Sequence, residues 1–161
     1  MNEPKYNLEE RLLDYSAEII RCAERLPRTL ASKHVASQLL RSGTSPLPNH
    51  GEAQAAESAD DFIHKMSICL KELRESHRWL RLIKRVPLVK EPSRIEPLLK
   101  ETEELIRIFV ASIRTAQKNK IAPRGATASR NSAAFDVGRS TFDVRRSNKT
   151  LDSTAPLGKT L

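Results

Sequence analysis

Apolar residues recur at alternating steps of four and three residues near the start of the chain. This pattern runs through Leu8, Leu12, Tyr15, Ile19, Cys22 and Leu26. Such steps place side chains on one face of an α-helix, as in helices that pack lengthwise against their neighbours. Asn7 and Glu10 have the spacing of an N-terminal capping box, and Pro27 cannot continue the helix. The pattern predicts a helix over about residues 8–26.

Three further helical stretches follow the first. The second spans about 29–57, with a kink near 43–48 where Gly43, Pro46 and Pro48 interrupt the pattern. The third spans about 59–86 and begins at a Ser58 cap; its apolar seam is Phe62, Met66, Cys69, Leu73, Ser76, Leu80 and Ile83. The fourth spans about 92–118; its seam is Ile95, Leu98, Thr102, Leu105, Phe109 and Ile113.

The short connections between these stretches force consecutive helices to lie antiparallel. The predicted fold is therefore all-α, an antiparallel up-down-up-down four-helix bundle that occupies residues 1–119. From about residue 120 the aliphatic residues become too sparse for a core. We expect residues 120–161 to be a disordered, low-complexity basic tail. It repeats F-D-V-G-R-S-T as F-D-V-R-R-S-N and could bind RNA or DNA loosely through its cations: Arg139, Arg145, Arg146 and Lys149.

Splitting the chain at this boundary changes the meaning of its net charge of +8. Residues 1–119 hold 20 Lys and Arg against 17 Asp and Glu, whereas the tail holds 8 against 3. The bundle is therefore close to neutral. A high isoelectric point alone does not identify it as a nucleic-acid-binding domain.

Cys22 and Cys69 are isolated and lie on apolar helical stripes, so we expect two buried thiols rather than a metal site. No apolar run reaches the roughly 18 residues of a membrane-spanning helix, and the polar N-terminus does not resemble a signal peptide. A cytoplasmic protein without membrane contact is the expectation.

Enzymatic motifs are weak. Asp61 and His64 have the spacing of half a di-metal carboxylate site, but the sequence has no second acid–x–x–His pair to complete it. The segment between Gly43 and Gly51 lacks the Lys-Ser/Thr of a phosphate-binding loop, and no G-x-S-x-G nucleophile motif occurs. The sequence predicts no enzyme, no metal site and no cofactor, and a metal-binding bundle enzyme is kept only as a remote alternative.

The strongest surface feature is a basic stripe on the third helix. Its members follow steps of three and four, beside the apolar seam: Lys71, Arg74, Arg78, Arg81 and Arg85. These side chains could follow a phosphate backbone. Alternatively, they form a solvated face paired with nearby acids, namely Glu72, Glu75, Glu101, Glu103 and Glu104. Aromatic residues are too few for base stacking, so any nucleic-acid contact should be electrostatic.

Polar side chains also gather where the second helix is interrupted and turns into the third: Arg41, Asn49, Glu52, Gln54 and Glu57. Buried polar groups require partners. These five residues therefore either satisfy one another within the bundle or contact another subunit.

A set of short motifs occurs in order along the helical part of the chain: R-S-G-T-S at 41–45, Asn49 with Glu52 and Ala53, and Ser58. The set continues with D-F-I-H-K at 61–65, K-E-L-R-E at 71–75, W-L at 79–80 and A-S-I-R-T-A at 111–116. By these motifs, residues 7–119 resemble the small bacterial four-helix bundle proteins, also called 23S rRNA-intervening sequence proteins. Pro46 and Pro48 depart from the family pattern, in which one proline or none occurs at this place.

The resemblance implies a homopentameric ring of bundles with no known catalysis. Relatives include the accessory protein of diversity-generating retroelements, which associates with a reverse transcriptase and nucleic acid. The leading hypothesis is a non-enzymatic homo-oligomeric scaffold with weak, sequence-independent nucleic-acid binding through the basic stripe. The alternative is a protein–protein adaptor without a nucleic-acid role.

Overall fold

The computed structural model describes residues 7–86, 88 and 95–121. Within these residues the chain forms α-helices and no strand. The helices are α1 (Leu8–Glu24), α2 (Leu30–Thr44), α3 (Pro46–Gln54), α4 (Ala59–Arg85) and α5 (Glu96–Ile121). The prediction of an all-α bundle is confirmed. Residues 122–161 of the predicted tail and the first residues of the fourth predicted helix, 92–94, lie outside the described residues. Residues 120 and 121, predicted as tail, belong to α5.

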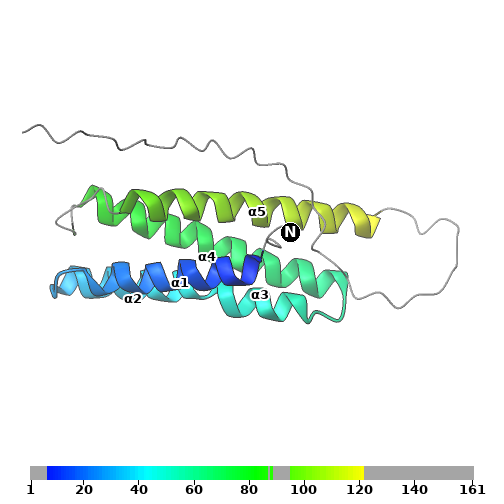
Figure 1. Ribbon diagram of the computed structural model, residues 1–161, viewed down its shortest axis with the longest axis horizontal. Helices are drawn as coiled ribbons and strands as arrows, with labels where there is room; N and C mark the ends of the chain where they lie inside the picture. Colours follow the sequence, from blue (N-terminus) through cyan, green and yellow to red (C-terminus); the bar gives the residue numbers. More distant parts are fainter. Residues whose placement is uncertain (1–6, 87, 89–94, 122–161) are drawn as a thin grey trace, which may run out of the picture. The chain divides into compact units, whose positions relative to one another are not determined.

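The predicted kink in the second helix is the junction between α2 and α3. Pro46 and Pro48 have no N–H to donate to the carbonyls of Ser42 and Thr44, so the helical hydrogen-bond ladder is interrupted there. Ser45 nevertheless keeps a right-handed helical backbone (φ −59°, ψ −34°). The chain therefore continues in nearly the same direction, and α3 extends beyond α2 (Figure 1).

Side-chain caps fix the starts of three helices. The Asn7 side chain accepts hydrogen bonds from the amides of Glu9 and Glu10, at 3.1 and 3.3 Å. Thr29 accepts from the amide of Ser32, and Ser58 from that of Asp61. These bonds satisfy amides that lack an intrahelical partner, so they set where each apolar stripe begins.

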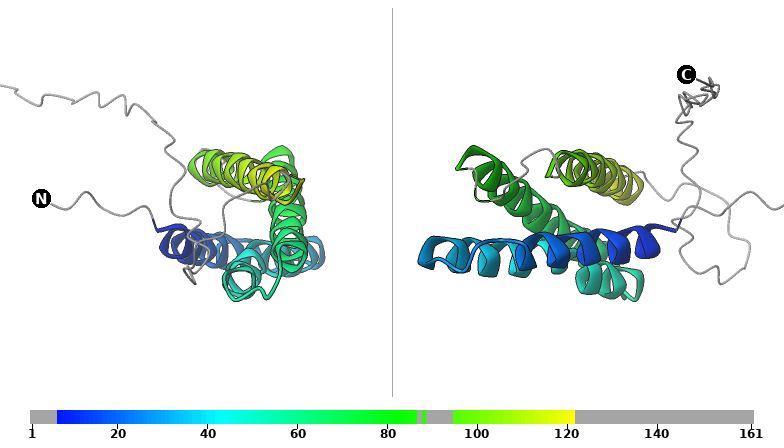
Figure 2. Two further views of the ribbon diagram at one scale, coloured as in Figure 1. Left: turned by 90° about the vertical axis from the view of Figure 1, so that its right-hand side faces the viewer. Right: turned by 60° about the vertical axis from the view of Figure 1, so that its left-hand side comes forward.

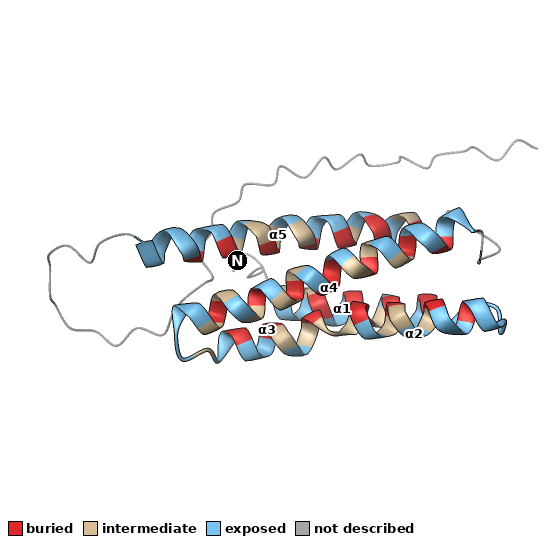
Figure 3. Ribbon diagram, turned by 180° about the vertical axis from the view of Figure 1, so that it is seen from behind, coloured by how far each residue is buried: buried red, intermediate tan, exposed pale blue. Residues whose placement is uncertain are grey.

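The two collinear helices α2 and α3 run in one direction, and α1, this pair, α4 and α5 alternate in direction, with α1 and α4 diagonal to each other. Both pack against α2, α3 and α5, while α4 makes its largest contact with α5 (Figures 1 and 2). Burial follows one stripe along each helix, and the outward faces are exposed (Figure 3). An antiparallel up-down arrangement therefore accounts for all the predicted stretches.

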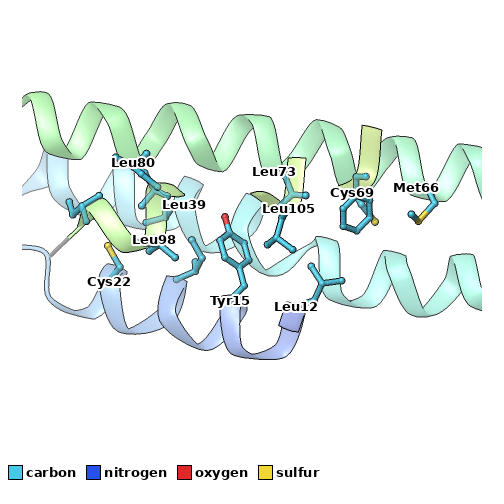
Figure 4. Packing of buried hydrophobic residues seen from close by; sticks show 14 of the residues in the cluster. Leu12, Tyr15, Cys22, Leu39, Met66, Cys69, Leu73, Leu80, Leu98 and Leu105 are labelled. Carbon is cyan, nitrogen blue, oxygen red and sulfur yellow. The ribbon is translucent and has the colours of Figure 1, made fainter. Parts of the chain in front are cut away.

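The core is formed by the predicted seams. Tyr15, Leu73 and Leu105 from three different helices are almost fully buried and lie close together (Figure 4). Gly43 lets α2 approach α1 closely, since a Cβ atom there would lie 2.6 Å from Ile19 Cγ2. Cys22 and Cys69 are free and buried, as predicted.

Candidate nucleic-acid interface

The basic stripe lies on the outer face of α4. The Ser58 cap begins this helix, and its apolar seam turns toward the core. All five members of the stripe are therefore exposed: Lys71, Arg74, Arg78, Arg81 and Arg85. Lys84 and Arg85 also occupy the last turn, where cations are favoured by the helix dipole.

An open groove of about 410 Å³ runs between α4 and α5. Its lining is Arg74, His77, Arg78, Arg81, Glu103, Ile106 and Arg107. Three of the five predicted residues thus line one groove, whereas Lys71 and Arg85 do not. Sequence reasoning missed His77 and Arg107. The step from Arg74 to His77 is a visible helical spacing, but Arg107 could be found only by knowing that α5 lies beside α4.

The acids predicted to pair with the stripe have other partners. Glu101 forms a two-point contact with Arg11, with N–O distances of 2.5 and 2.9 Å. Glu103 contacts His77 Nε2 at 3.3 Å and Arg107 at 3.8 Å, and Glu104 also pairs with Arg107.

Glu72 and Glu75 both pair with Arg41 of α2. Among the described residues, none of the five stripe members forms an ion pair with these or other carboxylates. In the described part of the chain the stripe is therefore a solvated face, as in the predicted alternative, but without the predicted pairing to these acids. A groove rich in unpaired guanidinium groups can bind phosphate oxygens.

The polar residues around the helix break have partners within the chain, with one exception. Arg41 Nη1 lies 3.4 Å from Glu72 Oε2, and its other amino group bonds Glu75. Trp79 Nε1 donates to the same Glu75 carboxylate at 3.3 Å. Burial raises the pKa of Glu75, but the hydrogen bonds from Trp79 and Arg41, together with the positive charges of Arg41 and Lys71, outweigh burial and lower it below its ordinary value. The bond to Glu75 correspondingly raises the pKa of Arg41.

The other members of this polar group lie on α3 and just after it. Asn49 Nδ2 donates to the Ser45 carbonyl at 2.9 Å, and Glu52 pairs with Lys65 at 2.5 Å. Gln54 Nε2 lies 3.2 Å from His50 Nε2. Glu57 is exposed and has no hydrogen-bond or ion-pair partner among the described residues. Four of the five are therefore satisfied locally, and a role of this group in contacting another subunit remains a prediction.

His50 is buried with an incomplete set of hydrogen bonds. Its ring packs edge-on against Phe109 of α5, with centroids 6.2 Å apart. Nδ1 has no partner among the described residues. Burial lowers the pKa of His50, and the negative charge of Glu9 partly opposes this shift. Burial therefore favours the neutral form of His50.

The buried thiols do not form a reactive site. Burial raises the pKa of Cys69 to about 12 and also raises that of Cys22. Thiolates, not thiols, act as nucleophiles and metal ligands. Within the described residues, no three His, Cys, Asp or Glu side chains gather in a way that could hold a metal ion. Asp61 and His64 remain a lone pair there.

Comparison with known proteins assigns the chain to a family. The sequence profile of the 23S rRNA-intervening sequence protein family matches residues 6–111. The chain belongs to this family. The match covers the groove and the helix break.

A solved structure supports the same assignment. It is the crystal structure of a protein of unknown function from the S23 ribosomal protein family of Bacteroides thetaiotaomicron, 29% identical in sequence, with a TM-score of 0.62. The match covers 67% of this chain and 99% of that protein. No curated protein matches the chain. Neither the family description nor that of the neighbour names an enzymatic activity.

None of the helices in the described part of this family member is long and apolar enough to cross a membrane.

Proposed function

We propose that this protein is a non-enzymatic, self-associating helical scaffold that binds nucleic-acid backbones through the α4–α5 groove. The observation that carries the proposal is the absence of carboxylate partners for Arg74, Arg78 and Arg81 within the described residues. A paired arginine would have to break an ion pair to bind phosphate, whereas these three need only shed water. The free thiols of Cys22 and Cys69 fit the reducing cytoplasm as its location.

The groove favours backbone contact over base recognition. Arginine recognises phosphate oxygens through paired N–H groups, and each phosphate contact releases counterions whatever the base sequence. The groove lining contains no aromatic ring besides that of His77, so it offers no stacking platform for successive bases. The Glu103 carboxylate, held by His77 and Arg107, repels phosphate at the α5 edge. Binding should therefore be weak and concentrated along α4.

The test is the salt dependence of binding to labelled RNA and DNA of unrelated sequences, measured by fluorescence anisotropy on the full chain. We compare the wild type with Arg74→Glu/Arg78→Glu/Arg81→Glu. Loss of three phosphate contacts should reduce the slope of log K against log salt by about three. Affinity at low salt should fall at least about tenfold, equally for all sequences.

The matched control is Arg25→Glu/Arg28→Glu/Lys33→Glu. It makes the same change in net charge at exposed positions outside the groove. Circular dichroism confirms that both variants are folded. If the control weakens binding as much as the groove variant, net charge rather than the groove binds the nucleic acid. If the wild type does not bind at low salt, the adaptor alternative replaces the nucleic-acid role.

A further inference from the structure

The two walls of the α4–α5 groove differ in chemistry. On α4, Arg74, Arg78 and Arg81 present guanidinium groups without ion-pair partners in the described part of the chain. On α5, the Glu103 carboxylate lines the same groove, and its side chain is 49% exposed. Phosphate contact uses only the α4 wall, because a carboxylate repels phosphate. Binding of a nucleic-acid backbone therefore leaves the α5 wall without a role.

The Glu103 carboxylate is positioned to accept hydrogen bonds. His77 Nε2 lies 3.3 Å from Oε1, and Arg107 Nη2 lies 3.8 Å from Oε2, so both oxygens have a neighbour that also lines the groove. Each carboxylate oxygen can accept more than one hydrogen bond, so both retain capacity toward the groove. The neutral donors that suit a carboxylate are hydroxyl groups, and acidic side chains of dinucleotide-binding folds accept from ribose hydroxyls in this way.

An apolar contact lies beside this acceptor. Ile106 is three residues after Glu103, so the two side chains occupy the same face of α5. Ile106 is partly buried and packs against the hydrophobic core, which fixes its position in the groove. A single flat base can cover an aliphatic side chain of this kind and needs no series of aromatic rings.

The groove has the size of a small-molecule site. Its volume of about 410 Å³ lies within the range of about 300–1,000 Å³ that such sites occupy. Arg74 and Arg81 are seven residues apart, which is about 10 Å along α4. Lys71 and Arg85, further along the helix in either direction, do not line it. The groove is therefore long enough for one nucleotide.

We infer that the groove binds one free ribonucleoside 5′-oligophosphate, with its phosphates on the α4 arginines, its ribose hydroxyls on Glu103 and its base against Ile106. A free nucleotide offers two neighbouring hydroxyls to the two carboxylate oxygens, whereas a nucleotide inside an RNA strand has its 3′ oxygen esterified. The inference rests on the same arginines as the proposed function but requires no polymer. Because both ligands use these arginines, a free nucleotide should displace nucleic acid and so regulate its binding.

Isothermal titration calorimetry on the full chain, without divalent metal ions, tests the inference. The probes are adenosine 5′-diphosphate (ADP) and its 2′,3′-dideoxy analogue, which have the same base and phosphates and differ only in the two hydroxyls. The wild type should bind ADP at least about fivefold more tightly, because hydrogen bonds to a charged acceptor are among the stronger ones. Equal affinity for the two probes overturns the inference.

Glu103→Ala is the decisive variant. It removes a negative charge, so both probes should gain affinity, but the preference for ADP over the dideoxy analogue should disappear. Glu104→Ala is the matched control, since Glu104 also pairs with Arg107 but does not line the groove, and it should keep the preference. A preference that survives in Glu103→Ala overturns the assigned role of Glu103 and with it the inference.

The triple variant Arg74→Glu/Arg78→Glu/Arg81→Glu locates the phosphates. It should bind neither probe, whereas Arg25→Glu/Arg28→Glu/Lys33→Glu should keep most of the affinity. If the triple groove variant still binds ADP as tightly as the wild type, the nucleotide lies elsewhere and the inference is wrong.

The remaining outcomes separate this inference from the proposed function. A wild type that binds the labelled oligonucleotides but not ADP overturns the inference and leaves nucleic-acid binding standing. A wild type that binds ADP with a preference dependent on Glu103, but binds no oligonucleotide, supports the inference and removes the nucleic-acid role. A wild type that binds neither overturns both.

Discussion

On the side of α4 that faces α2, Arg41 bonds both Glu72 and Glu75, whereas on the side that faces α5 the arginines of the stripe have no carboxylate partner among the described residues. The same helix thus carries a polar surface whose charges are paired, toward α2, and a basic surface whose charges are unpaired, toward α5. Acidic residues lie near both surfaces. The difference is that Glu103, the acid in the groove lining, is already bonded to His77 and Arg107. Whether the arginines have carboxylate partners, rather than how many charges lie nearby, therefore distinguishes a surface that stabilises the bundle from one that can bind a ligand.

The largest effect should come from adding a side chain at Gly43, where α2 approaches α1 most closely. The Cβ atom of Gly43→Ala would lie 2.6–2.9 Å from three side-chain atoms of the fully buried Ile19. We expect a loss of about 1–3 kcal/mol in the free energy of unfolding, measured by urea denaturation. Gly51→Ala is the matched control, since a Cβ atom there meets nothing within 4 Å. Because alanine favours helix, it should stabilise the protein by about 0.5–1 kcal/mol. Equal effects at both glycines would contradict this account.

A smaller effect should separate the two sides of α4 directly. Arg41→Ala leaves the nearly buried Glu72 without its ion-pair partner, so the urea midpoint should fall. Arg78→Ala removes an exposed side chain that has no ion-pair partner among the described residues, so its midpoint should stay within error of the wild type. Nucleic-acid binding should be weakened more by Arg78→Ala than by Arg41→Ala. A loss of stability in Arg78→Ala equal to that in Arg41→Ala would show that the groove is also a structural surface.

Two serines of α4 provide a third test. Ser76 and Ser67 both donate to the carbonyl four residues earlier, at 2.9 and 2.7 Å. Only Ser76 is buried, and it also bonds the Ser42 hydroxyl of α2 at 3.0 Å. Ser76→Ala should therefore cost about 1 kcal/mol in urea denaturation, whereas Ser67→Ala should change stability by less than about 0.5 kcal/mol. If Ser67→Ala lowered the free energy of unfolding as much as Ser76→Ala, the effect would come from the hydrogen bond to the carbonyl four residues earlier and not from the bond between Ser76 and Ser42.

The smallest effect concerns pH. The folded-state pKa of His50 is below its unfolded value of about 6.5, so the unfolded chain takes up the proton first as pH falls. The stability that neutral His50 contributes is present above pH 6.5 and is lost as pH falls through the folded pKa. Urea denaturation between pH 7.5 and 5 should show a weaker pH dependence for His50→Gln than for the wild type. His64→Gln, at an exposed position, should retain the wild-type dependence.

Helix positions could be predicted from the sequence because the apolar period and the caps are local. Asn7, Thr29 and Ser58 stand at the starts of the helices, and the two prolines stand where the second helix divides. The stripe on α4 could be predicted for the same reason. The groove could not, because Arg107 enters it from α5, some 30 residues further along the chain.

The sequence by itself determined the helices, their apolar faces, the break at Pro46 and the family, since each of these depends on residues a few positions apart. Only the tertiary structure decided which charges are free. Glu101 was a predicted partner of the stripe, but in the structure it bonds Arg11 of α1 and does not line the groove. Ion pairs form over a few ångströms in space, and the distances between helices set those contacts.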